Sequence, residues 1–140
     1  MELPAELMRL REFHGHLGPF ATLGCRAGEH ALRELGARRH FGLHIVVRCP
    51  PQPPPSCLVD GLQFSTGCTM GKRNIELVPS DDISIEFRNQ DTGQELVLRL
   101  PAETAAALPR WIQELGEDAA SRRVWEAGVA LFEQEVGPGR

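Results

Sequence analysis

The sequence lacks the features that mark several common classes of protein. No stretch of its 140 residues approaches the ~20 apolar residues that a membrane-spanning helix requires. Acidic residues outnumber basic ones by 19 to 15, and the pI is near 5.7, so we expect no broad basic face for nucleic acid. The acidic N-terminus has no hydrophobic segment of the kind found in signal peptides, which favours a cytoplasmic protein.

Lysine is almost absent. Lys72 is the single lysine among 15 basic residues, and the rest are arginines. An ammonium group is a compact charge, whereas guanidinium is a planar fork. A single lysine in an arginine-rich chain therefore suggests a site that needs a compact cation, with chance as the alternative.

The four cysteines are more consistent with structural thiols, metal ligands or redox groups than with a disulfide framework, because thiols stay reduced in the cytoplasm. Apolar residues make up 41% of the chain and charged residues 24%, which is ordinary for a globular protein. The length suits one domain covering residues 1–140.

Hydrophobic periodicity and turn residues predict the elements. Helices are expected over 4–13, 19–35, 57–65, 101–116 and 118–136, with a disturbance at Pro109 and a stop in the terminal GPGR. Strands are expected over 43–48, 74–78, 83–88 and 95–100, the last three as an antiparallel meander. The order predicts an α+β fold with a mostly antiparallel sheet packed against helices.

Two glycines in the second predicted helix lie one turn apart. Each costs about 1 kcal/mol of helix propensity relative to alanine. Close approach of another element or a ligand to Gly24 and Gly28 would offset this cost.

The segment His14-Gly15-His16-Leu17-Gly18-Pro19 interrupts the pattern between the first two predicted helices. Both histidines are therefore expected on an irregular connection, at the N-terminus of the helix that follows. The positive end of a helix disfavours protonated imidazole and so suits neutral, metal-ligating histidines.

The stretch 57–74, CLVDGLQFSTGCTMGKRN, holds the other candidate site residues. Zinc accepts histidine nitrogen and cysteine sulfur, and a catalytic zinc site commonly offers three protein ligands and one open position. His14 or His16, together with Cys57 and Cys68, could supply that set. Asp60 could act as a general base or fix a histidine tautomer. Lys72 could hold an anionic substrate or lower a thiol pKa.

Other interpretations remain open. Cys57 and Cys68 could cycle as a dithiol without metal, or be small buried hydrophobes, as most free cysteines are. In the second case the chain would be an interaction subunit whose motif residues only build the core. Cys25 is interpreted as packing within a helix, and Cys49 is assigned no chemistry.

Two blocks of sequence resemble the FmdE family, which is named after formylmethanofuran dehydrogenase, a molybdenum or tungsten enzyme. The first is FHGHLGP at 13–19, continued by LGCRAG at 23–28. The second is SCLVDGLQ at 56–63 with TGCTMGKRN at 66–74. The blocks occur in the order and at the separation that the family shows, and the similarity extends over roughly residues 10–100.

The resemblance implies an α+β core, a homodimer and a metal site, most plausibly zinc, that joins the HGH loop to the 57–72 block. Metal ligands would be His16, Cys57 and Cys68, and His14, Asp60 and Lys72 would surround an open position. The chemistry would be Lewis-acid or hydrolytic action on a small anionic substrate, or an accessory role to a molybdenum or tungsten oxidoreductase of one-carbon metabolism.

The sequence departs from the family pattern in two respects. Many members carry cysteine where this chain has Gly18, so one candidate ligand is missing. Many also carry a C-terminal zinc-ribbon-like module, which this chain lacks, so we expect a core-only member.

Overall fold

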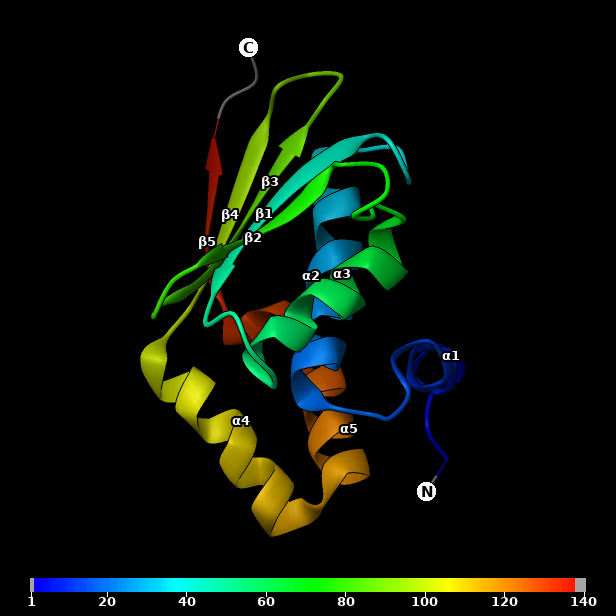
Figure 1. The fold of residues 1–140 in the computed structure, drawn as a ribbon, viewed down its shortest axis with the longest axis vertical. Coiled ribbons are helices and arrows are strands. Elements are labelled where there is room, and N and C mark those ends of the chain that lie inside the picture. Colours follow the sequence, from blue (N-terminus) through cyan, green and yellow to red (C-terminus); the bar gives the residue numbers. More distant parts are fainter. Residues whose placement is uncertain (1, 138–140) are drawn as a thin grey trace.

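The computed structural model describes residues 2–137, which form a five-stranded sheet covered on one face by helices (Figure 1). The helices are α1 (Ala5–His14), α2 (Pro19–Leu35), α3 (Leu58–Thr66), α4 (Ala102–Leu115) and α5 (Glu117–Ala127), with short 3-10 turns at Pro55–Cys57 and Gly128–Leu131. The strands are β1 (Leu43–Cys49), β2 (Ile75–Pro79), β3 (Ile83–Asn89), β4 (Glu95–Leu100) and β5 (Glu133–Gly137). The predicted α+β class is confirmed.

The sheet order is β2-β1-β3-β4-β5. β1 and β2 run parallel, with Ile45 opposite Ile75, and the other three pairs are antiparallel. The predicted three-strand meander is therefore wrong in one pairing, because β1 lies between β2 and β3. The reason is that the chain from β1 to β2 passes through α3, and a crossover of that kind joins parallel strands.

The C-terminal part of the chain differs from the expected helix over 118–136. α5 ends at Ala127, where Gly128 adopts φ +56° and ψ −139°, outside the helical region. Residues 133–137 then form β5, an exposed edge strand on β4, with an ion pair of 3.1 Å between Arg99 and Glu135. The terminal stop falls mostly at 138–140, outside the described residues.

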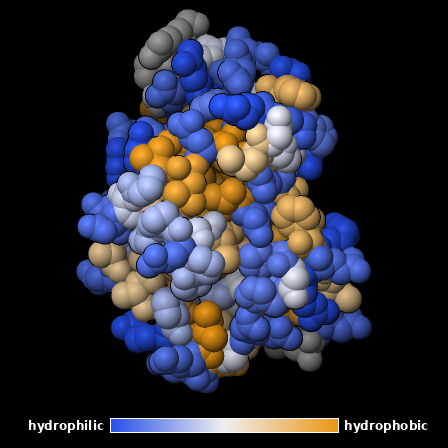
Figure 2. All heavy atoms as spheres, viewed as in Figure 1, coloured by the Kyte–Doolittle hydropathy of each residue, from blue (hydrophilic) through white to orange (hydrophobic). Residues whose placement is uncertain are grey.

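The main core lies between the sheet and helices α2 and α3. Alternate residues of β1 face it, including Ile45 and Val47, which are fully buried. Figure 2 views this arrangement edge-on: most of the face is hydrophilic, and hydrophobic atoms gather between the sheet and the two helices. A smaller core lies where α1 meets α2, and contains Leu7, Leu10 and Leu17.

Three glycines allow α2 and α3 to pack closely. A Cβ at Gly24 would lie 2.2 Å from the Leu58 carbonyl oxygen, and one at Gly61 would lie 1.9 Å from the Ala21 carbonyl oxygen. A Cβ at Gly28 would lie 2.1 Å from Ser65 Oγ. The expected close approach at Gly24 and Gly28 is therefore confirmed, and it fixes α3 against the start of α2.

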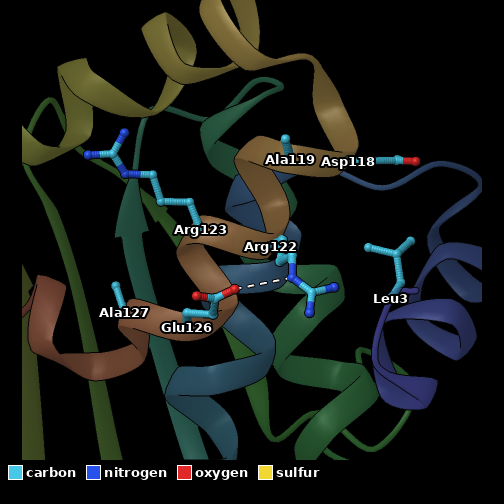
Figure 3. A pocket seen from close by; sticks show the side chains of 7 residues that line it. All are labelled: Leu3, Asp118, Ala119, Arg122, Arg123, Glu126 and Ala127. Carbon is cyan, nitrogen blue, oxygen red and sulfur yellow. Dashed lines mark hydrogen bonds and ion pairs between the residues drawn. The ribbon is translucent and has the colours of Figure 1, made fainter. Parts of the chain in front are cut away.

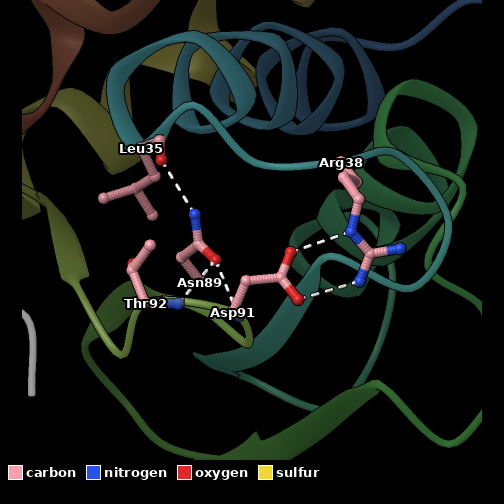
Figure 4. A network of polar contacts seen from close by, with 5 residues as sticks. All are labelled: Leu35, Arg38, Asn89, Asp91 and Thr92. Carbon is pink, nitrogen blue, oxygen red and sulfur yellow. Dashed lines mark hydrogen bonds and ion pairs between the residues drawn. The ribbon is translucent and has the colours of Figure 1, made fainter.

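A polar network anchors the β3–β4 turn to the end of α2 (Figure 4). The Asn89 amide donates to the Leu35 carbonyl at 2.9 Å and accepts from the backbone of Asp91 and Thr92. Arg38 adds a two-pronged pair with the Asp91 carboxylate, at 2.8 and 3.1 Å. None of the helices formed by residues 2–137 has the length and apolar content needed to span a membrane.

Candidate functional site

The HGH loop is a short connection that local sequence fixes at both ends. α1 ends at Gly15, whose φ of +101° favours glycine. α2 begins at Pro19, whose fixed φ suits the first turn of a helix. The loop is thereby held at the N-terminus of α2, as the sequence predicts.

His14 is buried and oriented by a carboxylate from α3. Its Nδ1 lies 2.6 Å from Asp60 Oδ2, and its side chain is 7% exposed. Because the carboxylate accepts, Nδ1 carries the proton. Nε2 is then left inside the protein with no partner among the described residues. Buried polar atoms are nearly always paired, so an unpaired one in a loop is a candidate ligand atom.

His16 repeats this arrangement at the surface. Its Nδ1 lies 2.6 Å from Glu117 Oε1, at the first residue of α5, and its ring centroid is 4.6 Å from that of His14. The two imidazoles thus each use Nδ1 for a carboxylate and keep Nε2 free for a ligand. Sequence reasoning did not identify Glu117, because it lies 101 residues away in the chain.

Gly18 leaves room beside these rings. A Cβ built at Gly18 would lie 3.5 Å from His16 Cε1 and 3.9 Å from His16 Nδ1, both ordinary contacts. Its backbone is extended, with φ −139°, so a larger residue would be tolerated. The position where the related proteins carry cysteine therefore adjoins the histidines directly.

Cys57 begins the α3 segment and is half buried. Burial raises the pKa of its thiol, and the negative charge of Asp60, one turn along the helix, raises it further. A charged Cys57 in turn raises the pKa of Cys49, which burial has already brought to about 11. Cys49 at the end of β1 is thus a near neighbour of Cys57.

Cys68 and Lys72 lie beyond the other end of α3. The Cys68 thiol is 1% exposed and donates to the Leu43 carbonyl at 3.5 Å. Burial raises its pKa, although hydrogen bonds and the charge of Lys72 act in the opposite direction. Lys72 Nζ lies 3.4 Å from Thr69 Oγ1 and 5.8 Å from the Phe41 ring centroid.

The structure brings together some of the expected site residues. His14, His16 and Asp60 form one group. Within residues 2–137, however, ligand atoms of His16, Cys57 and Cys68 do not form a set within 4.8 Å of one another. Nor does any contact join Lys72 to the histidines in the described part of the chain. The ligand and catalytic roles of these residues stay predictions.

One further ligand-type group was not expected from the sequence. Glu6 of α1 and Cys25 and Glu29 of α2 place one ligand atom each within 4.8 Å of one another. The spacing of Cys25 and Glu29, four residues apart on a helix, was a usable signal, but no local pattern points to Glu6.

A hollow of about 600 Å³ lies between α5 and the N-terminal segment (Figure 3). Seven residues line it: Leu3, Asp118, Ala119, Arg122, Arg123, Glu126 and Ala127. Arg122 spans it by pairing with Glu126 at 3.1 Å. Neither histidine lines it, and it contains no unpaired buried polar atom among the described residues.

The sheet, the helical cover and the carboxylate-bound histidine pair define an α+β protein with a ligand-type site at the start of α2. Residues 13–135 match the family model described as "FmdE, Molybdenum formylmethanofuran dehydrogenase operon". The chain therefore belongs to the FmdE family, as the two sequence blocks predict.

Two relatives illustrate this membership. A probable S-adenosyl-L-methionine-binding protein of Archaeoglobus fulgidus is 40% identical over 75 residues, which cover 49% of this chain and 19% of the relative. The chain thus spans about a fifth of that relative's length. The crystal structure of an FmdE-like protein of tungsten formylmethanofuran dehydrogenase from Syntrophus aciditrophicus superposes with a TM-score of 0.64. It is 19% identical and covers 94% of this chain and 70% of its own, so it establishes the fold.

Proposed function

We propose that this FmdE-family chain binds a divalent transition metal, zinc, at the HGH loop. The observation that carries the proposal is the buried, unpartnered Nε2 of His14, with Nδ1 held by Asp60 at 2.6 Å. Histidines that ligate metals commonly donate their second ring N–H to a carboxylate, which fixes the tautomer and increases ligand basicity.

The donor atoms of the site suit zinc. His14 Nε2 and His16 Nε2 are nitrogen ligands, and Cys57 at the start of α3 is the thiol that accompanies Asp60 on its helix face. Cys68 fits less well as a ligand, since its thiol would have to leave the Leu43 carbonyl. We therefore favour His14 over Cys68 as a ligand and assign Asp60 to its orientation.

A zinc ion here would supply Lewis acidity toward a small anionic substrate. The protein's own contribution is to orient the two imidazoles through Asp60 and Glu117. Because His14 Nε2 is buried, a ligand must approach past His16, whose side chain is 56% exposed. His16 is therefore expected to move when the site is filled.

The alternative of a Cys57–Cys68 dithiol has less support. Thiolates attack disulfides, and burial raises the pKa of both thiols, which disfavours the thiolate form. We keep as part of the proposal that the chain is a homodimer and an accessory to a molybdenum or tungsten oxidoreductase. The support for the latter is the operon named in the family description.

Metal analysis tests the proposal. Untagged protein should contain zinc, and His14→Leu should lose one equivalent, because leucine fills the ring's space without a ligand atom. His44→Leu, on the sheet, is the matched control and should keep the wild-type content. Equal zinc in His14→Leu and His44→Leu would refute the proposal. A zinc-free wild type that forms a Cys57–Cys68 disulfide would favour the dithiol alternative.

A further inference from the structure

Helices α1 and α2 bring three ligand-type side chains together at a distance from the HGH loop in sequence. A carboxylate oxygen of Glu6, the Sγ of Cys25 and a carboxylate oxygen of Glu29 all lie within 4.8 Å of one another. Cys25 and Glu29 share one face of α2, four residues apart, and Glu6 comes from the first turn of α1. The three atoms therefore surround a point between the two helices.

The thiol lies under the carboxylates and is sealed from solvent. Cys25 is 1% exposed and belongs to the smaller core, with Leu7, Leu10 and Leu17. Its sulfur is 3.9 Å from Glu29 Oε1, a long contact, and it has no polar partner outside the three-residue group among the described residues. The Glu29 side chain is itself 19% exposed. This burial distinguishes the group from a solvated acidic patch.

The local charge is poorly compensated. Arg26 is the cation next to the group, with Nη1 3.6 Å from Glu29 Oε1. It is also engaged elsewhere, since its Nε donates to the Trp125 carbonyl and its guanidinium lies 3.9 Å over the Trp125 ring. Burial and the hydrogen bond with Glu6 raise the pKa of Glu29 to about 7, and burial with the nearby Glu29 and Glu6 charges raises that of Cys25 to about 12.

We propose that Glu6, Cys25 and Glu29 form a second metal site, which takes Zn²⁺ through two carboxylate oxygens and one thiolate. Three protein ligands leave a fourth tetrahedral position for water. The sulfur ligand favours zinc over the hard ions Mg²⁺ and Ca²⁺, which bind oxygen. The site does not depend on the proposed function of the HGH loop.

Binding must release protons. The ion displaces the thiol proton of Cys25 and any proton that Glu6 and Glu29 share, so each Zn²⁺ sends between one and two protons into solvent. The bound ion would tie α1 to α2. Since α1 ends at His14 and α2 begins at Pro19, it would hold both ends of the HGH loop.

The His14→Leu protein isolates this site, because it lacks the ligand proposed for the first one. After removal of metal with EDTA, the full-length variant is titrated with Zn²⁺ in two buffers of different ionisation enthalpy, and with Co²⁺ under an absorption spectrometer. We expect one Zn²⁺ per chain, net proton release, and a sulfur-to-cobalt charge-transfer band.

Matched variants in the His14→Leu background assign the ligands. Cys25→Ser should abolish the cobalt–sulfur band, and Glu29→Gln should weaken Zn²⁺ binding by at least about tenfold, the minimum expected even for an orienting partner. Glu34→Gln, an exposed glutamate on the same helix, should bind like its parent. Cys25→Ala, together with a circular dichroism spectrum, separates lost binding from lost folding.

The proposal fails if the His14→Leu protein binds no Zn²⁺, which would leave Glu6 and Glu29 as a proton-sharing pair. It also fails if Cys25→Ser or Cys25→Ala folds and retains the cobalt–sulfur band. Neither result bears on the HGH site, which is judged by the comparison of His14→Leu with His44→Leu.

Discussion

The two ends of α3 carry the two halves of the second sequence block, and they differ in how their polar atoms are used. At the C-terminal end, Thr66 Oγ1 donates to the Leu62 carbonyl at 2.6 Å and accepts from the Cys68 amide at 3.1 Å. Asn74 closes the same loop by accepting from Thr69 and donating to the His40 carbonyl. Near the N-terminal end, His14 pairs with Asp60 and leaves Nε2 buried without a partner in the described chain.

This difference separates residues that build the loop from residues that await a ligand. A hydrogen-bonded polar group contributes to stability, whereas an unpaired buried one costs about 1–3 kcal/mol. We infer that the chain tolerates this cost at His14 because a ligand offsets it. The TGCTMGKRN block, although it is unusual in sequence, is then mainly structural.

The largest expected effect comes from the glycine that joins the two ends. Gly61→Ala should cost about 1–3 kcal/mol or more of unfolding free energy, the usual range for overpacking, because its Cβ would overlap the Ala21 carbonyl. It should also displace Asp60 from His14. Chemical denaturation of the variant measures the cost. Gly71→Ala, where the nearest atom is 3.9 Å away, should cost little, and equal losses would contradict the packing argument.

Thr66→Val tests the satisfied end. The substitution keeps the shape and removes both hydrogen bonds, leaving the Cys68 N–H buried, so we expect a loss of about 1–3 kcal/mol in unfolding free energy. Metal content should not change. Thr104→Val, on the half-buried face of α4, is the control. A loss of zinc from a folded Thr66→Val protein would show that the C-terminal end of α3 belongs to the metal site.

Gly18→Cys tests the unsatisfied end by adding a ligand. The new thiol would adjoin His16, where there is room for a side chain, so zinc should bind more tightly, with a cobalt–sulfur band added to the spectrum. A competition titration against a chelator measures the change. Gly18→Ala should leave the affinity unchanged, and an equal gain in both variants would argue against ligation.

Asp91→Asn should have the smallest effect, because this ion pair is at the surface. The two hydrogen bonds from Arg38 lower the pKa of Asp91, so its contribution is present above the unfolded-state pKa near ~4 and disappears as pH falls through the lower folded-state value. Wild type and variant should therefore differ slightly at pH 7 and converge in acid. Thermal melts across this pH range measure it, and a difference that grows in acid would have the wrong sign.

Elements with strong local signals could be predicted from the sequence. The bounds of α2 and β4 follow from periodicity, from Pro19 and Gly36 at the helix ends and from the alternation along 95–100. The pairing of β1 with β2 could not, because strand order depends on the path of α3 rather than on either strand. The apolar stripe of 118–136 continues past Gly128, and a single positive φ converts its end into β5.

The site was predictable to a similar degree. The expectation that Asp60 orients a histidine agrees with its contact to His14, and the HGH loop lies at a helix N-terminus as expected. Sequence spacing could not tell that His14 is the buried ring and His16 the exposed one. Nor could it place Cys68 in the core, since burial depends on packing against β1.

The most direct test of the account is nitrogen NMR of the histidine side chains in the Cys25→Ser variant, which removes the second site. Without metal, His14 should be neutral, with its proton on Nδ1. One equivalent of Zn²⁺ should then shift its Nε2 resonance, while those of His44 stay in place. A proton on Nε2, or an Nε2 resonance that does not respond to zinc, would contradict the claim that His14 is held by Asp60 as a metal ligand.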